Sequence, residues 1–210
     1  VQILLQQKLD ISQWREMTVD LTITPQDVSI SNVRQILFAG GKWVGNYISP
    51  ELEVPEAHKA VLMRVGAYAR DHGHVADEGI NCGIDYFVAG DEVIVTEINA
   101  RWTGGLFPAE FLRRLAITQP AVAFFDMVPV AQSKAVQTFQ REHLFPAAGD
   151  AFAYVPMGFT PFAMEIEGAE RYFVWQIVAG DFAAFVEAKR QTLPEDTFPT
   201  AELILQEALS

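Results

Sequence analysis

The sequence predicts an α+β fold, in which helices pack on a mixed, largely antiparallel β-sheet. Two short turns support this prediction, because each separates two apolar segments with strand composition, as in a β-hairpin. These turns are Gly40-Gly41 and Gly90-Asp91. Between them, the residues that follow Pro55 form an apolar stripe at helical spacing. Strands joined by tight turns and interrupted by a helix are typical of an α+β layer.

The elements can be placed in chain order from their periodicity and their turn residues. In the first part we expect strands over 1–9 and 15–23, a hairpin over 36–48, a helix from Pro55 to Arg70 that Gly73 ends, and a second hairpin around Gly90-Asp91. Further on we expect helices over 108–115 and 120–127, strands over 151–155 and 172–178, and helices over 181–190 and 200–209, the last with Thr200 as N-cap.

A weak boundary is predicted over residues 132–150, where Ser, Lys, Gln, Pro and Gly dilute the apolar run. It divides the chain into a first unit, residues 1–131, and a C-terminal α+β extension, residues 132–210.

Composition narrows the class of protein. A chain of 210 residues with 50% apolar residues can bury a substantial core. Its net charge of −12 argues against a nucleic-acid partner, because phosphate neutralisation requires clustered Lys and Arg. No segment approaches the ~18 apolar residues that span a bilayer, so we expect no membrane partner and a cytoplasmic location. The single cysteine, Cys82, excludes an intrachain disulfide and is expected to be a small buried side chain.

Charged side chains collect on one face of the strand that ends the second hairpin. Because side chains alternate along a strand, Glu97, Asn99 and Arg101 project from one face. The other face then carries Ile94, Thr96 and Ile98.

Asp85, on the preceding strand, should lie opposite Glu97 if the hairpin closes through a three-residue loop over 90–92. The two Cβ atoms would then be about 5 Å apart. Like charges at that separation repel, so we expect a compensating cation. Mg²⁺ is suited to the site, because it takes one or two carboxylates, often with an amide oxygen, and completes its shell with water and phosphate. A solvated sheet face that happens to carry these charges is the structural alternative.

These residues also carry a resemblance to a known family. The segments G-I-D-Y-F and T-E-I-N-A-R-W-T-G-G resemble the metal-binding end of the ATP-grasp ligases. The resemblance implies that Asp85, Glu97 and Asn99 bind Mg²⁺, or Mn²⁺ in its place, on the phosphates of ATP. It also implies that Arg101 acts as the catalytic residue, facing the phosphates or an acyl-phosphate. Backbone N–H groups of the next turn would approach ATP or the acyl substrate, at Gly104 and Gly105.

A second match lies near the N-terminus. In this family a strand runs into an interdomain hinge that meets the adenine, and a Glu near the ribose begins the next strand. Gln6, Gln7 and Leu9 resemble the hinge, and Glu16 resembles the ribose contact. The sequence departs from the family at Gln6, because the family more often has Glu there.

The resemblance covers about residues 1–116 and corresponds to the second half of an ATP-grasp unit, here followed by a C-terminal extension. Val1 already belongs to an expected strand, so we expect a partial chain. The N-terminal nucleotide-clamping half would then come from the upstream part of the same polypeptide or from a partner subunit. The implied activity is ATP-dependent carboxylate–amine ligation through an acyl-phosphate, with a small carboxylate and an amine as substrates.

Two alternatives use the same acidic face. One is a metal-dependent hydrolase that binds no nucleotide. The other is a degenerate, non-catalytic binding module derived from an ATP-grasp ligase.

Two further expectations concern isolated residues. We expect Arg34 to be a surface arginine in preference to a phosphate contact. His58, His72 and His74 lack the spacing of a zinc site and are expected at the surface or at a helix cap.

Overall fold

The structure is a computed structural model and describes residues 13–146, 151–166 and 168–209. Its strands are β1 Arg15–Ile23, β2 Val28–Ala39, β3 Lys42–Ile48, β4 Ile80–Ala89, β5 Glu92–Asn99, β6 Ala121–Pro129, β7 Phe152–Phe159, β8 Met164–Ile166 and β9 Ala169–Gly180. Its helices are α1 Glu56–Asp71, α2 Leu106–Arg114, α3 Ser133–Glu142, α4 Phe182–Thr192 and α5 Pro199–Leu203, with short helical turns η1 Val130–Gln132 and η2 Ile204–Ala208. The expected first strand, with Gln6, Gln7 and Leu9, lies outside the described residues.

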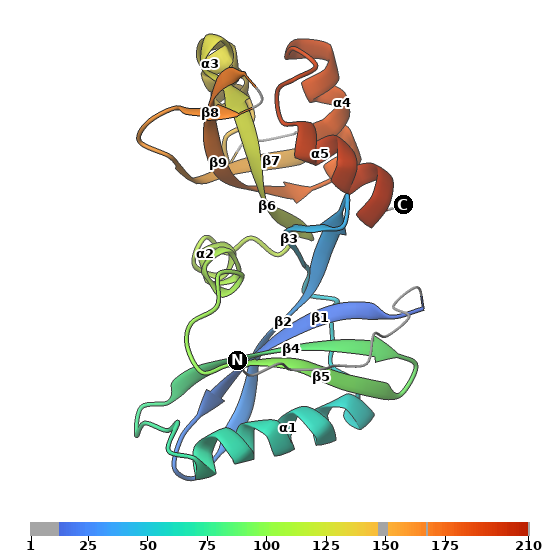
Figure 1. Ribbon diagram of the computed structural model, residues 1–210, viewed down its shortest axis with the longest axis vertical. Helices are drawn as coiled ribbons and strands as arrows, with labels where there is room; N and C mark the ends of the chain where they lie inside the picture. Colours follow the sequence, from blue (N-terminus) through green and yellow to red (C-terminus); the bar gives the residue numbers. More distant parts are fainter. Residues whose placement is uncertain (1–12, 147–150, 167, 210) are drawn as a thin grey trace, which may run out of the picture.

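One sheet runs through the whole molecule (Figure 1). Its strands lie in the order β5-β4-β1-β2-β3-β6-β9-β7, and β8 pairs with β9. The paired strands run antiparallel throughout the described residues. The predicted α+β fold with a largely antiparallel sheet is therefore confirmed.

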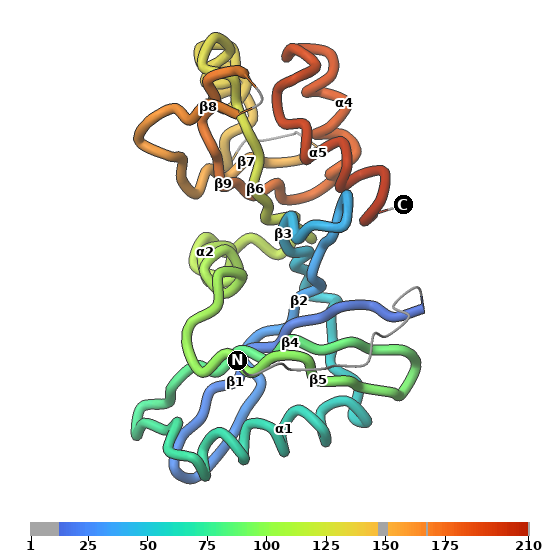
Figure 2. Tube along the Cα trace, viewed as in Figure 1, coloured from blue at the N-terminus to red at the C-terminus, as the bar shows by residue number. Residues whose placement is uncertain are grey.

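The sheet has two halves that meet where β3 pairs with β6 (Figure 2). In the first half, α1 covers one face of β1, β2, β4 and β5 (Figure 1). Alternate side chains of these strands form the core with the helix, among them Val19, Leu21, Ile84 and Leu62. The buried Cys82 belongs to the same core, as the sequence predicted. The face of these strands away from α1 is free to carry polar residues.

The second half of the sheet is packed on both faces. Helices α3, α4 and α5 cover one face and build the largest core, around Phe124, Phe139 and Phe185. On the other face, α2 packs through Leu112 against β6, β7 and β9. This helix lies between the two halves in Figure 1.

Several expected elements are confirmed with small shifts of their ends. The strand over 15–23 is β1, and the first hairpin is β2 and β3 joined by Gly40-Gly41. Both glycines have positive φ, +58° and +69°, as a type I′ hairpin turn requires. The helix after Pro55 is α1, which has Pro55 as its N-cap.

The helix predicted over 120–127 is wrong, because these residues form strand β6. Its side chains are buried on both faces, with Phe124 in the core under α4 and Ala123 in the core under α2. A strand buried on both faces has no alternating pattern, and a short apolar run does not distinguish it from a buried helix.

The last third contains two helices that differ from the prediction. Helix α3, which was not predicted, lies inside the segment 132–150 that the sequence marked as a weak boundary, and the division of the chain after residue 131 stays a prediction. The final helix is α5 followed by a π-helical turn, and its N-cap is Phe198, not Thr200. The N–H of Thr200 instead donates to the side chain of Asp126.

Candidate functional site

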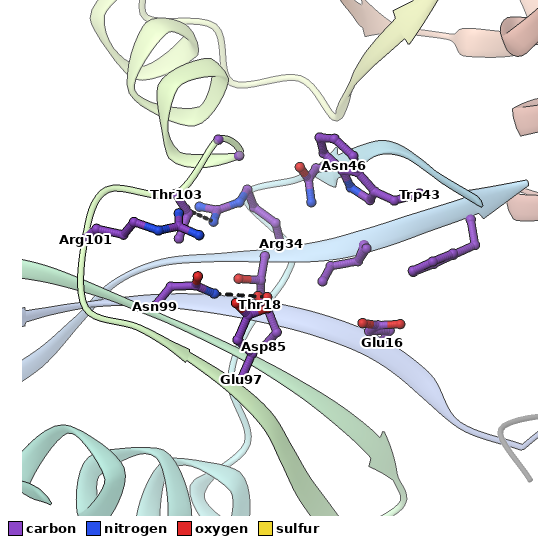
Figure 3. A pocket seen from close by; sticks show the side chains of 14 residues that line it. Glu16, Thr18, Arg34, Trp43, Asn46, Asp85, Glu97, Asn99, Arg101 and Thr103 are labelled. Atoms are coloured by element: carbon purple, nitrogen blue, oxygen red, sulfur yellow. Dashed lines mark hydrogen bonds between the residues drawn. The ribbon is translucent and has the colours of Figure 1, made fainter. Parts of the chain in front are cut away.

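A cavity of about 380 Å³ opens on the face of the first half-sheet that α1 leaves uncovered (Figure 3). Strand register explains which side chains reach it. Thr18 of β1 pairs with Asp85 of β4 on one side and with Arg34 of β2 on the other. Asp85 in turn pairs with Glu97 of β5. A single cross-strand row, Arg34–Thr18–Asp85–Glu97, therefore forms the floor of the pocket.

The predicted pairing of Asp85 with Glu97 is present, but it arises in a different way. The turn contains only Gly90 and Asp91, because Ala89 already pairs with Glu92. Such a turn alone would place Thr96 opposite Asp85. A β-bulge between the pairs of Asp85 and Tyr86 shifts the register by one residue.

Because of this bulge, side chains along β5 do not alternate as the sequence predicted. Val93 and Val95 pack against the core under α1. The extra residue, Thr96, then shifts the alternation, so that Glu97 and Asn99 point into the pocket together with Asp85 (Figure 3). The expected division, with Ile94, Thr96 and Ile98 on the face away from Glu97, is therefore wrong for Ile94.

Two acidic side chains that line the pocket, Asp85 and Glu16, have raised pKa values. Burial, and then the neighbouring Glu97 carboxylate, raise the pKa of Asp85, while the adjacent Thr18 hydroxyl lowers it. Burial and the charge of Asp85 also raise the pKa of Glu16. The amide of Asn99 donates to Asp85 Oδ2 at 3.2 Å and supplies only part of the compensation. The floor therefore favours either protons or a bound cation.

Arg34 is not a surface residue, in contrast to the sequence expectation, because its side chain is fully buried. Its Nη1 lies 2.5 Å from Asp20 Oδ2, and Asp20 is also fully buried. Arg34 Nη2 donates to Thr103 Oγ1 at 3.2 Å, and that hydroxyl donates to Asp20 Oδ1 at 3.2 Å. This closed network fixes the segment after β5, which carries Arg101, to strands β1 and β2.

Gly105 leaves room for this network because it has no side chain. A Cβ at this position would lie 2.7 Å from Asn46 Oδ1 and 2.8 Å from Arg34 Nε. Any other residue would push the buried guanidinium aside. Arg34 Nε itself has no hydrogen-bond partner among the described residues. Gly104 also lines the pocket, and no atom lies within 4 Å of a Cβ added there.

The structure brings together most of the residues singled out from the sequence. Glu16, Asp85, Glu97, Asn99, Arg101, Gly104 and Gly105 all line this pocket. Arg101 is exposed, and its guanidinium donates to the carbonyl of Trp102 at 3.3 Å. The individual roles predicted for these residues stay predictions.

Other lining residues were not found from the sequence: Thr18, Ile36, Phe38, Trp43, Asn46 and Thr103. For Thr18 a signal existed, since β1 alternates polar and apolar residues and Thr18 shares a face with Glu16. For Trp43 and Asn46 there was none, because their place in the pocket depends on how β3 pairs.

The histidines do not contribute to the site. His58 is buried, not exposed, and its Nε2 lies 2.8 Å from the carbonyl oxygen of Gly90. His72 caps α1, and His74 contacts the carbonyl of Asn81 at 2.9 Å. These contacts stabilise the turns at either end of α1.

The donor set in the pocket fits a hard cation with incomplete protein ligation. No group of three or more His, Cys, Asp or Glu side chains within residues 13–146, 151–166 and 168–209 could hold a metal. The paired acids Asp85 and Glu97, with the amide oxygen of Asn99, match the sparse set that Mg²⁺ uses when phosphate and water supply the remaining ligands. Burial, the largest cause of the raised pKa of Asp85, favours a cation beside this carboxylate.

The sequence matches no family model and no curated protein. Solved structures with a similar course of the chain include the phosphoribosylaminoimidazole carboxylase ATPase subunit from Aquifex aeolicus, with 9% identity, a TM-score of 0.48, and coverage of 85% of this chain and 55% of that one. Another is N5-carboxyaminoimidazole synthase from Aspergillus clavatus, solved with ADP and 5-aminoimidazole ribonucleotide, with 16% identity, a TM-score of 0.45, and coverage of 84% and 49%. A protein assigned to the ATP-grasp superfamily from Archaeoglobus fulgidus has 14% identity, a TM-score of 0.41, and coverage of 80% and 46%.

The chain thus spans about half the length of the solved structures that it matches. At these identities and TM-scores the likeness does not decide function, which has to be inferred from the geometry of the pocket. Within the described residues, no helix is both long and apolar enough to cross a membrane.

Proposed function

We propose that this chain forms the metal-binding half of an ATP-grasp carboxylate–amine ligase. The observation that carries the proposal is the juxtaposition of Asp85, Glu97 and Asn99 at the floor of one pocket, with Arg101 at its edge. These are the residues that the motif resemblance marks as metal ligands and catalytic arginine. The paired acids Asp85 and Glu97, together with the buried arginine network beside them, suit a ligand that carries both Mg²⁺ and phosphate.

In this proposal Asp85 and Glu97 hold Mg²⁺ or Mn²⁺, and the amide oxygen of Asn99 is available to the same ion. The metal, when bound, neutralises the charge on the phosphates of ATP. By holding that ion, Asp85 and Glu97 would orient the phosphates of ATP. Glu16, which lines the pocket at its β1 end, would meet the ribose.

The reaction proceeds in two displacements. An oxygen of the substrate carboxylate attacks the γ-phosphorus, the bond to the β-phosphate oxygen breaks, and ADP leaves. The amine nitrogen then attacks the acyl carbon, the bond from that carbon to the phosphate oxygen breaks, and inorganic phosphate leaves with the proton that the amine releases. Arg101 stabilises the charge on the transferred phosphoryl group and on the acyl-phosphate. Arg34 positions Arg101 by holding Thr103.

We also propose that the N-terminal half of the nucleotide clamp comes from the upstream part of the same polypeptide or from a partner subunit, and that the protein acts in the cytoplasm. Gln6, Gln7 and Leu9 would then form the adenine hinge between the two halves. Residues 1–131 would be the nucleotide-binding unit and residues 132–210 an extension that contacts the substrates.

Thermal unfolding with Mg²⁺ and a nonhydrolysable ATP analogue tests the proposal. Ligand at about 100 times its Kd stabilises a protein by about 2.7 kcal/mol, which corresponds to about 5–10 °C for a chain of this size. We expect this shift only when metal and nucleotide are both present. Asp85→Asn and Glu97→Gln should abolish it, whereas Glu92→Gln, at the start of the same strand and outside the pocket, should not.

The competing functions give different results in this assay or in an assay of ATP turnover. A hydrolase would be stabilised by Mg²⁺ or Mn²⁺ alone, with no further effect of nucleotide. A non-catalytic module would show no ATP turnover even with the upstream half restored. Full ATP turnover by Asp85→Asn or Glu97→Gln in the complete protein would contradict the assignment of these residues as metal ligands.

A further inference from the structure

A row of aromatic side chains, four of them exposed and two half-buried, begins at the pocket and is not used by the proposed chemistry. Successive ring centroids lie 5.3–6.5 Å apart from Trp102 through Phe107, Trp175 and Phe125 to Trp43. Phe173 stacks on Phe125 at 5.3 Å. We call these six residues the aromatic strip; its members are Trp43, Trp102, Phe107, Phe125, Phe173 and Trp175.

Strand register explains why the strip is uncovered. Along β6 and β9, alternate residues point toward α2, and at one end of these strands Ala123 and Ile177 lie in the core that this helix covers. Phe125 and Trp175, which pair with each other, continue the same face beyond the helix. The face is therefore built as a continuation of a core, but the short α2 covers only part of it.

The exposure of the strip is large for aromatic residues. Trp102 is 55% exposed, Phe107 48% and Trp43 47%. Contiguous apolar surface of this kind on a protein commonly marks a binding site, because water contact with it is unfavourable. The rings are also ordered: Phe125 stacks between Phe173 and Trp175 with interplanar angles of 18° and 17°. Such an arrangement offers a preformed surface to another planar ring.

One end of the strip lines the pocket, and the other end lies next to a residue that lines it, which indicates the kind of molecule that the strip binds. Trp43 lines the pocket directly, next to Phe38. At the other end, Trp102 follows Arg101, which lines the opposite side of the pocket (Figure 3). A molecule that lies along the strip can therefore place one end beside Arg101. The Arg101 guanidinium would repel a cationic group at that end, whereas a carboxylate forms a charge-assisted hydrogen bond with it.

We propose that the aromatic strip binds the ring of an aryl-bearing carboxylic acid, such as an aromatic amino acid or a peptide that carries one. This proposal rests on the proposed ligase function, because it names the acid substrate of the same site. The acid group lies at Arg101, close to the γ-phosphate, and the aryl group stacks along Trp175 and Phe125. The strip thus determines which acids are activated, while Asp85 and Glu97 determine that they are activated by ATP.

Binding of 3-phenylpropionate to the full chain tests this proposal directly, by calorimetry and by tryptophan fluorescence. Three of the four tryptophans belong to the strip, so a stacked ligand should change the emission. Stacking contributes about 0.5–1.5 kcal/mol, so Phe107→Ala and Phe125→Leu should each weaken binding about two- to tenfold. Phe159→Ala, at a 74% exposed ring outside the strip, is the matched control and should leave binding unchanged.

Three results would overturn the proposal. One is equal affinity for 3-phenylpropionate and for propionate, which lacks the ring. Another is loss of binding of the ATP analogue alone in Phe107→Ala, which would assign the strip to the nucleobase. A third is a concentration-dependent dimer that Phe107→Ala dissociates, which would make the strip an interface between copies. The two proposals can fail separately. The phenyl acid should still bind to Asp85→Asn. If the wild-type protein binds the phenyl acid but shows no Mg²⁺-dependent nucleotide binding, the ligase function fails and the proposal for the aromatic strip stands.

Discussion

Asp85 in the first half of the sheet and Asp126 in the second half are both carboxylates on internal strands, and burial raises the pKa of each. Their partners differ. Asp126 accepts hydrogen bonds from the N–H groups of Met127, Thr200 and Ala201 at 2.8–3.0 Å. Asp85 accepts one bond of 3.2 Å from Asn99 and lies opposite a second carboxylate.

The comparison separates two uses of an acid on an internal strand, fully buried at Asp126 and half-buried at Asp85. The chain itself fills the acceptor sites of Asp126, which ties α5 to β6 and is a structural task. Asp20 is likewise satisfied internally, by the guanidinium of Arg34. Asp85 alone of these three is left beside a like charge. An acid in this position costs stability unless a ligand supplies the missing cation, and such a cost is typical of functional sites.

The largest expected effect tests whether Asp20 is structural. Asp20→Asn leaves Arg34 buried with its charge uncompensated, so the free energy of unfolding should fall by about 3–5 kcal/mol. Denaturant unfolding measures this loss. Asp77→Asn, at an exposed position, is the control and should change stability by less than about 0.5 kcal/mol. A loss below about 1 kcal/mol for Asp20→Asn would show that the pair contributes little to the fold.

An intermediate effect is expected for Asp126→Asn. The substituted amide presents an N–H to at least one backbone N–H, so the free energy of unfolding should fall by about 1–3 kcal/mol. This substitution should also change the pH dependence. The pKa of Asp126 is raised to about 7, whereas an unfolded Asp titrates near about 3.9.

The sign of that pH effect follows from proton uptake. Between about pH 4 and pH 7 the unfolded chain releases this proton and the folded chain retains it, so raising the pH destabilises the fold. The difference in unfolding free energy between wild type and Asp126→Asn should therefore shrink as the pH rises through this window. A difference that stays constant from pH 4 to 7 would mean that Asp126 ionises normally in the folded protein.

The smallest expected effect has the opposite sign. Without metal, Asp85→Asn removes the repulsion between paired carboxylates and should raise the free energy of unfolding by about 0.5 kcal/mol at neutral pH. Glu92→Gln should have no such effect. Denaturant titrations at low salt, where the repulsion is least screened, give the best resolution. A clear loss of stability in Asp85→Asn would place Asp85 with Asp20 and Asp126 as a structural acid.

Local pattern accounts for what could be predicted from the sequence. Strand β1, the Gly40-Gly41 hairpin and α1 follow from period and turn chemistry. Strand β6 could not be recognised, because burial on both faces removes the alternation that distinguishes a strand. Helix α3 was missed because its polar residues dilute the apolar run, which was interpreted as a weak boundary.

The candidate site divides in the same way. Asp85 and Glu97 belong to one hairpin, so their proximity is a local property, and the predicted pairing is confirmed. The burial of Arg34 depends on β1 lying beside β2 and on the return of the chain at Thr103, 69 residues later. The aromatic strip combines residues from β3, α2, β6 and β9, and no short-range pattern announces it.

The single extra residue at Thr96 has a consequence for how this chain can vary. The two-residue turn alone would pair Thr96 with Asp85, so the bulge is what brings Glu97 opposite that acid. Removing Thr96 would make the pairing regular and would still leave Glu97 opposite Asp85, with Asn99 on the pocket face two residues later. Removing Ile98 instead would turn Asn99 toward the face that α1 covers. The hairpin therefore tolerates the loss of one residue at Thr96 but not two residues further along the strand.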